Sequence, residues 1–262
     1  MTIGSPERLA EDLLAELGIT TPEDIDVDAI AYHCGALITY ARLSGCDGRI
    51  LGGPERAIIT VNEDAPRGRR RFTAAHETAH WVYDKGKVEG ACTEEKITRA
   101  WGKSGVEQRA NKFAAELLLP RSMLDAYVPD APLDLDAVRS VVNRFDVSLT
   151  AAAIRMVKLS SRPAMVVCMS SQGRQWFFRS SLAPHTLWPV KAVQRGAGLH
   201  GLTRQAGASV GGLVAADVWT DRDDGDEYEL HEDSVMITDD LSLTIISWPD
   251  EGQIVALMEA EG

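Results

Sequence analysis

Residues 73–82 read Thr-Ala-Ala-His-Glu-Thr-Ala-His-Trp-Val and contain the pattern His76-Glu77-x-x-His80. The residues around this pattern are uncharged or apolar, which predicts a buried helix over residues 70–83. Positions four apart lie on the same face of an α-helix, so both imidazole rings project in one direction. Two neutral imidazoles on one face can bind a zinc ion, and the carboxylate between them can reach a water molecule on that ion. The alternative is a core helix with two satisfied histidines, but burying these polar groups without a partner would be costly.

A catalytic zinc site needs a third protein ligand and keeps its fourth position for water. The extended histidine form of the motif requires Gly at position 83 and His at position 86, whereas this chain has Tyr83 and Gly86. That form is excluded, which leaves a carboxylate on a later helix. Residues 106–120 are rich in strong helix formers and end at Pro120, so they predict such a helix.

Glu107 is the predicted third ligand, and Asn111 follows it by one helical turn. Small alanines on the same face would let the two helices approach closely, and Asn111 could then hold a histidine or the carboxylate. Glu116 is the alternative ligand. It lies about 180° round the helix from Glu107, so the two carboxylates cannot both face the metal. A solvated acid that favours the helix dipole is the remaining interpretation of Glu107.

Two separated motifs agree in order and spacing with one known family. They read Arg71-Phe-Thr-Ala-Ala-His-Glu-Thr-Ala-His-Trp81 and Glu107-Gln-Arg-Ala-Asn-Lys-Phe-Ala-Ala-Glu-Leu-Leu-Leu-Pro120. On these residues the chain resembles the ImmA/IrrE family of bacterial zinc metallopeptidases, over roughly residues 5–160.

The resemblance implies a compact, gluzincin-like protease domain in which His76, His80 and Glu107 bind Zn²⁺ and Glu77 is the general base. Mn²⁺ is the alternative metal in the cell. The resemblance also implies a substrate, which is a DNA-binding repressor of the helix-turn-helix type. Cleavage of such a repressor would derepress mobile-element or stress-response genes.

The order of the predicted elements indicates an α+β protein with two domains. Residues 1–160 are expected to form a zincin-like protease domain with a small antiparallel sheet, the motif helix and a helical bundle. The strands of this sheet are predicted at residues 37–41, 48–51 and 57–61, and residues 84–105 are predicted to form a loop or a short helix.

A second domain is predicted over residues 161–262, after a boundary at Lys158-Leu-Ser-Ser-Arg-Pro163. Predicted strands near 164–169, 175–179, 213–219 and 241–248 indicate a mainly antiparallel α+β domain. A sensory or regulatory role is one interpretation of this domain.

Two predicted helices at residues 134–144 and 149–159 resemble a helix-turn-helix pair. A DNA-reading helix needs polar and basic side chains along its length. The second helix is mostly apolar, so the pattern favours packing against the catalytic core over DNA reading.

The strand before the motif helix, Ala57-Ile-Ile-Thr-Val61, is a candidate for substrate binding. An extended peptide can add as a strand to an exposed sheet edge, which would place the scissile bond without reading much sequence. We expect this strand or its neighbour to be that edge, with Ile58, Ile59 and Thr60 in contact with the substrate. An ordinary core strand is the alternative.

Four arginines at positions 67, 69, 70 and 71 form a basic cluster at the predicted start of the motif helix. Positive charge there opposes the helix dipole, so a structural reason is not obvious from the sequence. Contact between Arg70 and an acidic substrate segment is one interpretation, and a solvated loop is the other.

Composition favours a cytoplasmic enzyme. The formal net charge of −12 argues against broad attraction to nucleic acid or to an anionic membrane. Four scattered cysteines without a Cys-x-x-Cys pair indicate neither a disulfide framework nor a thiolate zinc site. The N-terminal residues lack the apolar core of a signal peptide, and no apolar stretch is long enough to span a membrane.

The sequence thus favours a zinc-dependent endopeptidase with a protein substrate. The competing hypothesis is a non-proteolytic sensor that sequesters a repressor and keeps zinc for structure. An oxyanion-stabilising residue would be expected in an enzyme, and Tyr83, Tyr127 and Tyr40 are open candidates.

Overall fold

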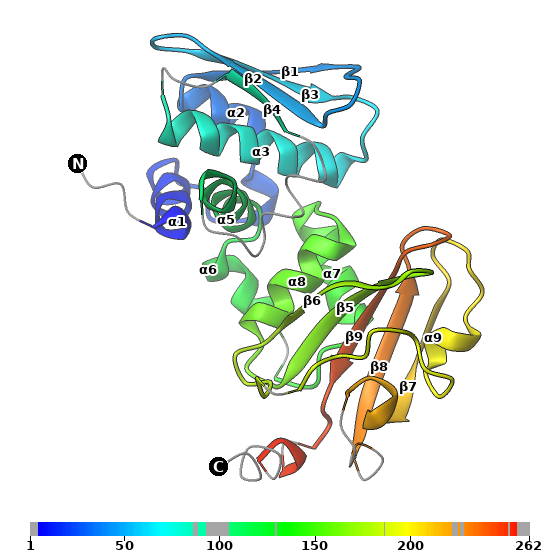
Figure 1. The fold of residues 1–262 in the computed structure, drawn as a ribbon. Helices are drawn as coiled ribbons and strands as arrows, with labels where there is room; N and C mark the ends of the chain where they lie inside the picture. The colour runs from blue at the N-terminus through cyan, green and yellow to red at the C-terminus, as the bar shows by residue number, and fades with distance from the viewer. Residues whose placement is uncertain are drawn as a thin grey trace. The chain divides into compact units, whose positions relative to one another are not determined.

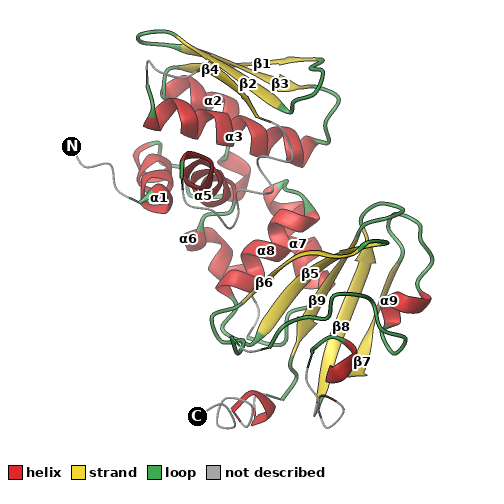
Figure 2. Ribbon diagram, viewed as in Figure 1, coloured by secondary structure: helices red, strands yellow, loops and turns green. Residues whose placement is uncertain are grey.

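The computed structural model describes residues 5–85, 89–92, 105–128, 130–185, 187–221, 225, 228–250 and 252–255, with only the backbone given for 89–92. The chain divides into two compact units, Met1–Leu124 with Val141–Ser148, and Asp125–Ser140 with Leu149–Gly262. The predicted α+β class is confirmed, because both units combine helices with a sheet (Figure 2). Residues 149–159 group with the second unit, whereas the predicted domain boundary lies after them. The boundary between functional domains stays a prediction.

The first unit is a four-stranded sheet with helices on one face (Figure 1). Side-chain caps fix where its early helices begin. Ser5 accepts a hydrogen bond from Arg8 N, and Asp26 accepts two from the first turn of the second helix. In chain order the elements are α1 (Pro6–Glu16), η1 (Pro22–Asp24), α2 (Val27–His33), β1 (Ala36–Ala41), β2 (Gly48–Gly52), β3 (Ala57–Asn62), α3 (Arg67–Tyr83), β4 (Glu89–Cys92), α5 (Val106–Leu118) and α6 (Arg121–Leu124).

The strand order of this sheet is β1-β3-β2-β4. Strand β3 pairs antiparallel with β2 but parallel with β1, so the prediction of a purely antiparallel sheet is wrong. The hairpin β2–β3 accounts for this, because β1 joins the free side of β3 rather than pairing with β2. Strand β4 lies within residues 84–105, where we predicted a loop or a short helix.

Strand β3 shows the alternation expected of a strand with one buried face. Ala57, Ile59 and Val61 are buried toward the helices, while Ile58 points outward and is 47% exposed. Both backbone edges of β3 are already paired, so it cannot accept a substrate strand, and that prediction is wrong for β3 itself. Among the described strands of this sheet, β1 and β4 form the edges.

The arginines at the start of α3 have acidic partners that are distant in sequence. Arg67 Nε donates to Asp146, and Arg71 lies 3.8 Å from the same carboxylate. Arg69 Nη2 donates to Asp47 Oδ2 at 3.0 Å. Asp146 has a positive φ of 54°, which aspartate tolerates better than most residues. These carboxylates offset the positive charge that opposes the α3 dipole, so most of the cluster has a structural role.

The second unit is a five-stranded antiparallel sheet with strand order β6-β5-β9-β8-β7 (Figure 1). Its first helix, α7, has its last residues in the first unit. Helix α8 packs on β5 and β6 and buries Ala152, Ala153 and Ile154, where we predicted packing against the catalytic core. The elements are η3 (Asp125–Tyr127), α7 (Leu135–Phe145), α8 (Leu149–Leu159), β5 (Ala164–Ser170), β6 (Gly173–Arg179), α9 (Gly198–Gly201), β7 (Ser209–Ala215), η4 (Ala216–Val218), β8 (Glu229–Met236) and β9 (Ser242–Ser247).

Strand β8 was not predicted, and its buried polar residues explain why. The inward positions include Glu232, which is 1% exposed. Its carboxylate accepts hydrogen bonds from Gly198 N, Leu199 N, Trp219 Nε1 and Ser234 Oγ at 2.7–2.9 Å. A buried carboxylate is tolerated only when such bonds replace its hydration. The strand that we predicted at 213–219 lies four residues earlier at its start, because β7 covers Ser209–Ala215.

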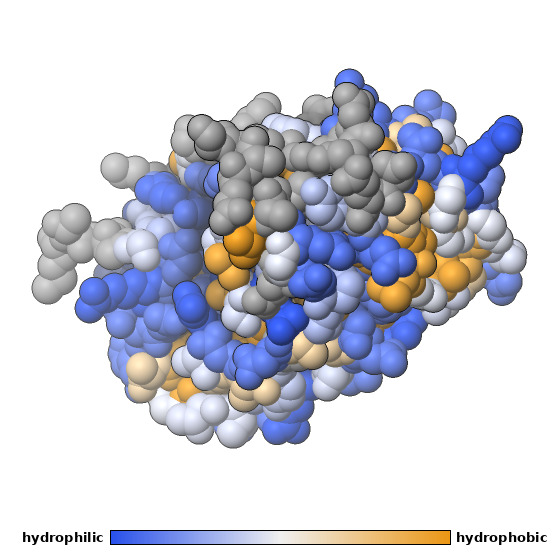
Figure 3. Space-filling view, turned by 90° about the horizontal axis from the view of Figure 1, so that it is seen from below, coloured by the Kyte–Doolittle hydropathy of each residue, from blue (hydrophilic) through white to orange (hydrophobic). Residues whose placement is uncertain are grey.

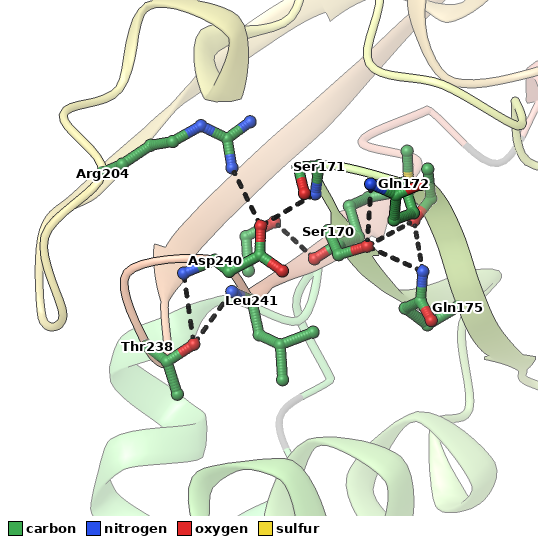
Figure 4. A network of polar contacts seen from close by, with 11 residues as sticks. Ser170, Ser171, Gln172, Gln175, Arg204, Thr238, Asp240 and Leu241 are labelled. Carbon is green, nitrogen blue, oxygen red and sulfur yellow. Dashed lines mark hydrogen bonds and ion pairs between the residues drawn. The ribbon is translucent and has the colours of Figure 1, made fainter.

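A polar network joins two turns of the second unit (Figure 4). Ser171 N donates to Asp240 at 3.1 Å, and Thr238 Oγ1 accepts from Leu241 N at 2.9 Å. The hydrogen bonds from Ser171 lower the pKa of Asp240 below its usual value. The network therefore fixes the turn before β9 against the turn after β5.

Three further features concern membrane-spanning helices, the cysteines and the surface. No helix among them combines the length and the apolar character needed to cross a membrane. Cys34, Cys46 and Cys168 are free thiols, and the side chain of Cys92 lies outside the description. The face seen from below is largely hydrophilic, with apolar residues in separate patches (Figure 3).

The start of α3 packs so closely on residues 147–148 that Gly68 has no room for a side chain. A Cβ at this position would lie 2.7 Å from Ser148 N and 2.9 Å from Val147 C. Alanine for glycine in a helix ordinarily gains about 1 kcal/mol of stability, but overpacking against backbone costs about 1–3 kcal/mol. We therefore expect Gly68→Ala to lower the midpoint of urea unfolding. Gly201→Ala, with no atom within 4 Å, is the control and should not lower it. A raised midpoint for Gly68→Ala would contradict the close packing.

Candidate metal centre

The candidate metal centre lies where α3 packs against α5 (Figure 1). Ala110 and Ala114 of α5 are almost fully buried, and their small side chains let the two helix backbones approach. Helix α3 is buried continuously from Phe72 to Trp81, which includes both motif histidines. The sequence therefore places polar groups in an apolar layer, where they need defined partners.

Three donor atoms from these helices converge. His76 Nε2 lies 3.0 Å from His80 Nε2 and 3.2 Å from Glu107 Oε2. The third side of the triangle, from His80 Nε2 to Glu107 Oε2, is 3.6 Å. The described residues thus bring together the three side chains that the sequence predicted as ligands, and their donor atoms could hold a metal ion.

The donor set and its spacing suit a tetrahedral zinc ion. Zinc binds imidazole nitrogen and carboxylate oxygen at about 2.0–2.2 Å, so two ligands at a tetrahedral angle lie about 3.3 Å apart. The three separations in this structure lie on either side of that value. Two nitrogens and one oxygen are also the ligand types of known catalytic zinc sites.

His76 contacts Asn111, one of the two partners that the sequence analysis left open for this asparagine. Its Nδ1 lies 2.9 Å from Asn111 Oδ1, and the asparagine is 2% exposed. The amide oxygen accepts a hydrogen bond only if Nδ1 carries the proton, which leaves Nε2 as the unprotonated atom that faces the other donors. Asn111 therefore selects the tautomer of His76 that can bind a metal.

His80 is held in its neutral form by its surroundings. The pKa of His80 is lowered to about 4, chiefly by burial and then by the neighbouring His76, while Glu107 acts in the opposite direction. The ring is therefore neutral at pH 7. A neutral imidazole is the form that binds a metal without first releasing a proton.

Glu77 occupies a space that a glycine leaves open. It is completely buried, and a Cβ at Gly48 of β2 would lie 3.0 Å from Glu77 Oε1. The same Cβ would lie 2.5 Å from Cγ2 of Thr73, one turn earlier on α3. Gly48 therefore makes room for the glutamate beneath the sheet. Sequence analysis missed this role, because nothing local distinguishes Gly48 from any other glycine at the start of a strand.

Glu116, the alternative ligand, has a different partner. Its Oε1 accepts a hydrogen bond from Arg121 N at 2.7 Å, which joins α5 to the start of α6. The side chain is 2% exposed, so this bond satisfies part of a buried carboxylate. Glu116 is not among the side chains that converge at the centre.

The predicted substrate-binding residues lie on the sheet and at the start of α3. Ile59 is fully buried, and the hydroxyl of Thr60 lies 3.3 Å from that of Thr39. The guanidinium of Arg70 lies 5.8 Å from the centre of the Tyr40 ring. Because both edges of β3 are paired, Ile58, Ile59 and Thr60 cannot bind an added substrate strand through their backbone, and only substrate contact by Arg70 stays a prediction.

Two of the candidate oxyanion donors also have defined surroundings. The hydroxyl of Tyr40 donates to Asp28 at 2.8 Å, and burial together with this contact raises the pKa of Tyr40 to about 12. The ring of Tyr83 lies beneath the guanidinium of Arg109, 4.9 Å away. The described contacts of both tyrosines are thus with residues other than the three converging ones.

Comparison with known proteins agrees with the geometry. Residues 32–157 match the peptidase M78 family, described as the IrrE N-terminal-like domain, so the resemblance to this family is confirmed. A solved structure of a Mycobacterium tuberculosis transcriptional regulator has a TM-score of 0.60 and 15% sequence identity, and the match covers 94% of this chain and 88% of that chain. At this identity the likeness establishes a shared fold alone. No curated protein sequence matches the chain at a significant level.

The contact between His76 and Asn111 can be tested by metal affinity. Loss of a residue that orients a ligand typically weakens metal binding by about 10- to 100-fold. We expect Asn111→Ala to weaken zinc binding by that factor in competition with a chromophoric chelator. Asn111→Asp keeps an oxygen acceptor and should retain most of the affinity. Equal affinities for the alanine variant and the unmodified protein would show that Asn111 does not orient the ligand.

Proposed function

We propose that this chain, whose residues 32–157 match the peptidase family with the IrrE N-terminal-like domain, is a zinc-dependent endopeptidase. One observation carries the proposal. The donor atoms of His76, His80 and Glu107 lie within 4.8 Å of one another, on the same helix pair that buries Glu77. A structural zinc site is normally closed by four protein ligands, and this group of described residues supplies three.

The residues of the site have distinct chemical tasks. Zinc held by His76, His80 and Glu107 would supply Lewis acidity, which polarises a carbonyl group and makes water easier to deprotonate. Glu77 takes a proton from the attacking water and later gives it to the leaving amine. Burial of Glu77 beneath Gly48 limits its movement, so the carboxylate is in position before the substrate binds.

Substitution of the base and of a ligand should separate chemistry from metal binding. Glu77→Gln keeps the size of the side chain but cannot accept the proton, so we expect zinc content and fold to persist while cleavage is abolished. His80→Ala removes a donor, so we expect zinc to be lost. Elemental analysis and a cleavage assay on the same preparations measure both effects. Full peptidase activity in Glu77→Gln would refute its role as the base.

A strand at the edge of the described sheet supports extended binding of the substrate. Strand β4 is an edge of the described sheet, and its Cys92 pairs with Gly48. Gly48 in turn lies next to the Glu77 carboxylate. A peptide that adds to β4 as a further strand would therefore pass near the base. We place the substrate on β4, which replaces the earlier assignment to β3.

The substrate we propose is a helix-turn-helix transcriptional repressor, whose cleavage would relieve repression of mobile-element or stress-response genes. The support for this substrate is the family that residues 32–157 match. Manganese is the alternative metal, because carboxylate and water ligands suit Mn²⁺.

The substrate assignment is tested by incubating the purified protein with the repressor encoded next to its own gene. We expect one sharp cut in the presence of Zn²⁺ or Mn²⁺, and none with a chelator or with Glu77→Gln. A stable complex that is never cut would instead support a non-proteolytic sensor that sequesters its partner. Gel electrophoresis and size-exclusion chromatography distinguish the two results.

A further inference from the structure

One face of the first-unit sheet carries an apolar row that no helix of that unit covers in the described structure. Helices α2 and α3 lie on the opposite face (Figure 1). Leu37, Ile58 and Leu51 are cross-strand neighbours, because Leu37 pairs with Ile58 and Ile58 pairs with Leu51. Their exposed fractions are 52%, 47% and 57%. We call these three residues the apolar row.

The row lies on the face of the sheet that is not part of the buried core of the first unit. The outward positions of a strand with one buried face are normally polar, because they meet water. Three large apolar side chains in adjacent strands form a contiguous exposed patch about 10 Å long, since neighbouring strands lie about 4.8 Å apart. Contiguous apolar patches of this kind mark surfaces that bind another molecule.

A pocket adjoins one end of the row. It has a volume of about 610 Å³ and shares Leu37 with the row. Tyr32 stands at the pocket and is 65% exposed, so an aromatic ring is available to a partner. Two basic residues, Arg56 and Lys85, also line the pocket, together with one acidic residue, Glu55, among the lining residues that the structure describes. The pocket is large enough to accept a side chain from a bound partner.

Positive charge flanks the row on both sides. Arg49 lies two residues before Leu51 on β2 and shares its outward face, and Arg56 directly precedes β3, two residues before Ile58. Each is exposed, and neither forms an ion pair with another residue that the structure describes. In a chain with a net charge of −12, such a local positive flank favours an acidic partner.

We propose that the apolar row and its pocket form a docking surface for an amphipathic helix of a partner protein, with an apolar ridge flanked by Asp or Glu. Side chains three and four apart on a helix are about 5–6 Å from one another, which is close to the spacing of the row. The acidic flanks of that helix would meet Arg49 and Arg56. The apolar row is on the sheet face opposite α3, whereas His76, His80 and Glu107 lie on α3 and α5, so the row and the metal centre are separate sites. This inference holds whether or not the chain cleaves its partner.

The test uses the full-length, zinc-loaded protein and a synthetic helical peptide of about 18 residues, with a leucine ridge and glutamate flanks. Fluorescence anisotropy measures its affinity for the protein and for two variants. We expect Leu51→Asp to weaken binding by about tenfold or more, because it places a charge in the centre of the contact. Leu213→Asp is the matched control, since Leu213 is 58% exposed on β7 of the second unit and should leave binding unchanged.

Charge is tested with a second peptide in which lysines replace the glutamates. We expect it to bind about tenfold more weakly than the acidic peptide, and Arg49→Glu to reduce this difference. Zinc content should be unchanged in all variants, which separates this result from failure of the metal centre. Equal binding of both peptides, or equal effects of Leu51→Asp and Leu213→Asp, would overturn the proposal. A dimer that Leu51→Asp dissociates in sedimentation analysis would also overturn it, because the occupant would then be a second copy.

Discussion

The packing of α3 on α5 is the constraint on which the candidate site depends. It brings two imidazoles and a carboxylate into a triangle with sides of 3.0, 3.2 and 3.6 Å. Without a cation, the Glu107 carboxylate oxygen lies against Nε2 of His76, and burial lowers the pKa of His80, which disfavours a charged ring beside the carboxylate. A divalent ion resolves this conflict, since it accepts all three donors at once. The alanines of α5 allow the close approach, and Asn111 fixes the tautomer that the arrangement needs.

Local sequence patterns were sufficient to predict the side chains at the centre. The four-residue spacing of His76 and His80 puts both on one face of a helix. The helix-forming run around Glu107 puts this residue on a face of a second helix, and the two faces meet in the structure. Helix geometry also showed that Glu107 and Glu116 cannot both face the metal, because they lie on opposite sides of α5. Helical periodicity is a local property of the sequence, so it can be recognised without knowledge of the tertiary fold.

Features that depend on distant residues could not be predicted in this way. The arginines at the start of α3 had no evident partner in the sequence, because Asp146, which binds Arg67 and Arg71, is 79 residues from Arg67 in the chain. Strand β8 was missed because Glu232 occupies an inward position, where backbone and side-chain donors from other segments satisfy it. Pairing within the small sheet and the space that Gly48 leaves for Glu77 are likewise properties of tertiary contacts.

X-ray absorption spectroscopy at the zinc edge of the reconstituted full-length protein tests the metal centre most directly. The account predicts a first shell of nitrogen and oxygen ligands at about 2.0–2.2 Å, with the outer-ring scattering of two imidazoles. His80→Ala should lose the bound zinc, whereas a surface control such as Leu213→Asp should leave the spectrum unchanged. A sulfur shell at about 2.3 Å, which signifies thiolate ligands, or the absence of stoichiometric metal after reconstitution, would contradict it.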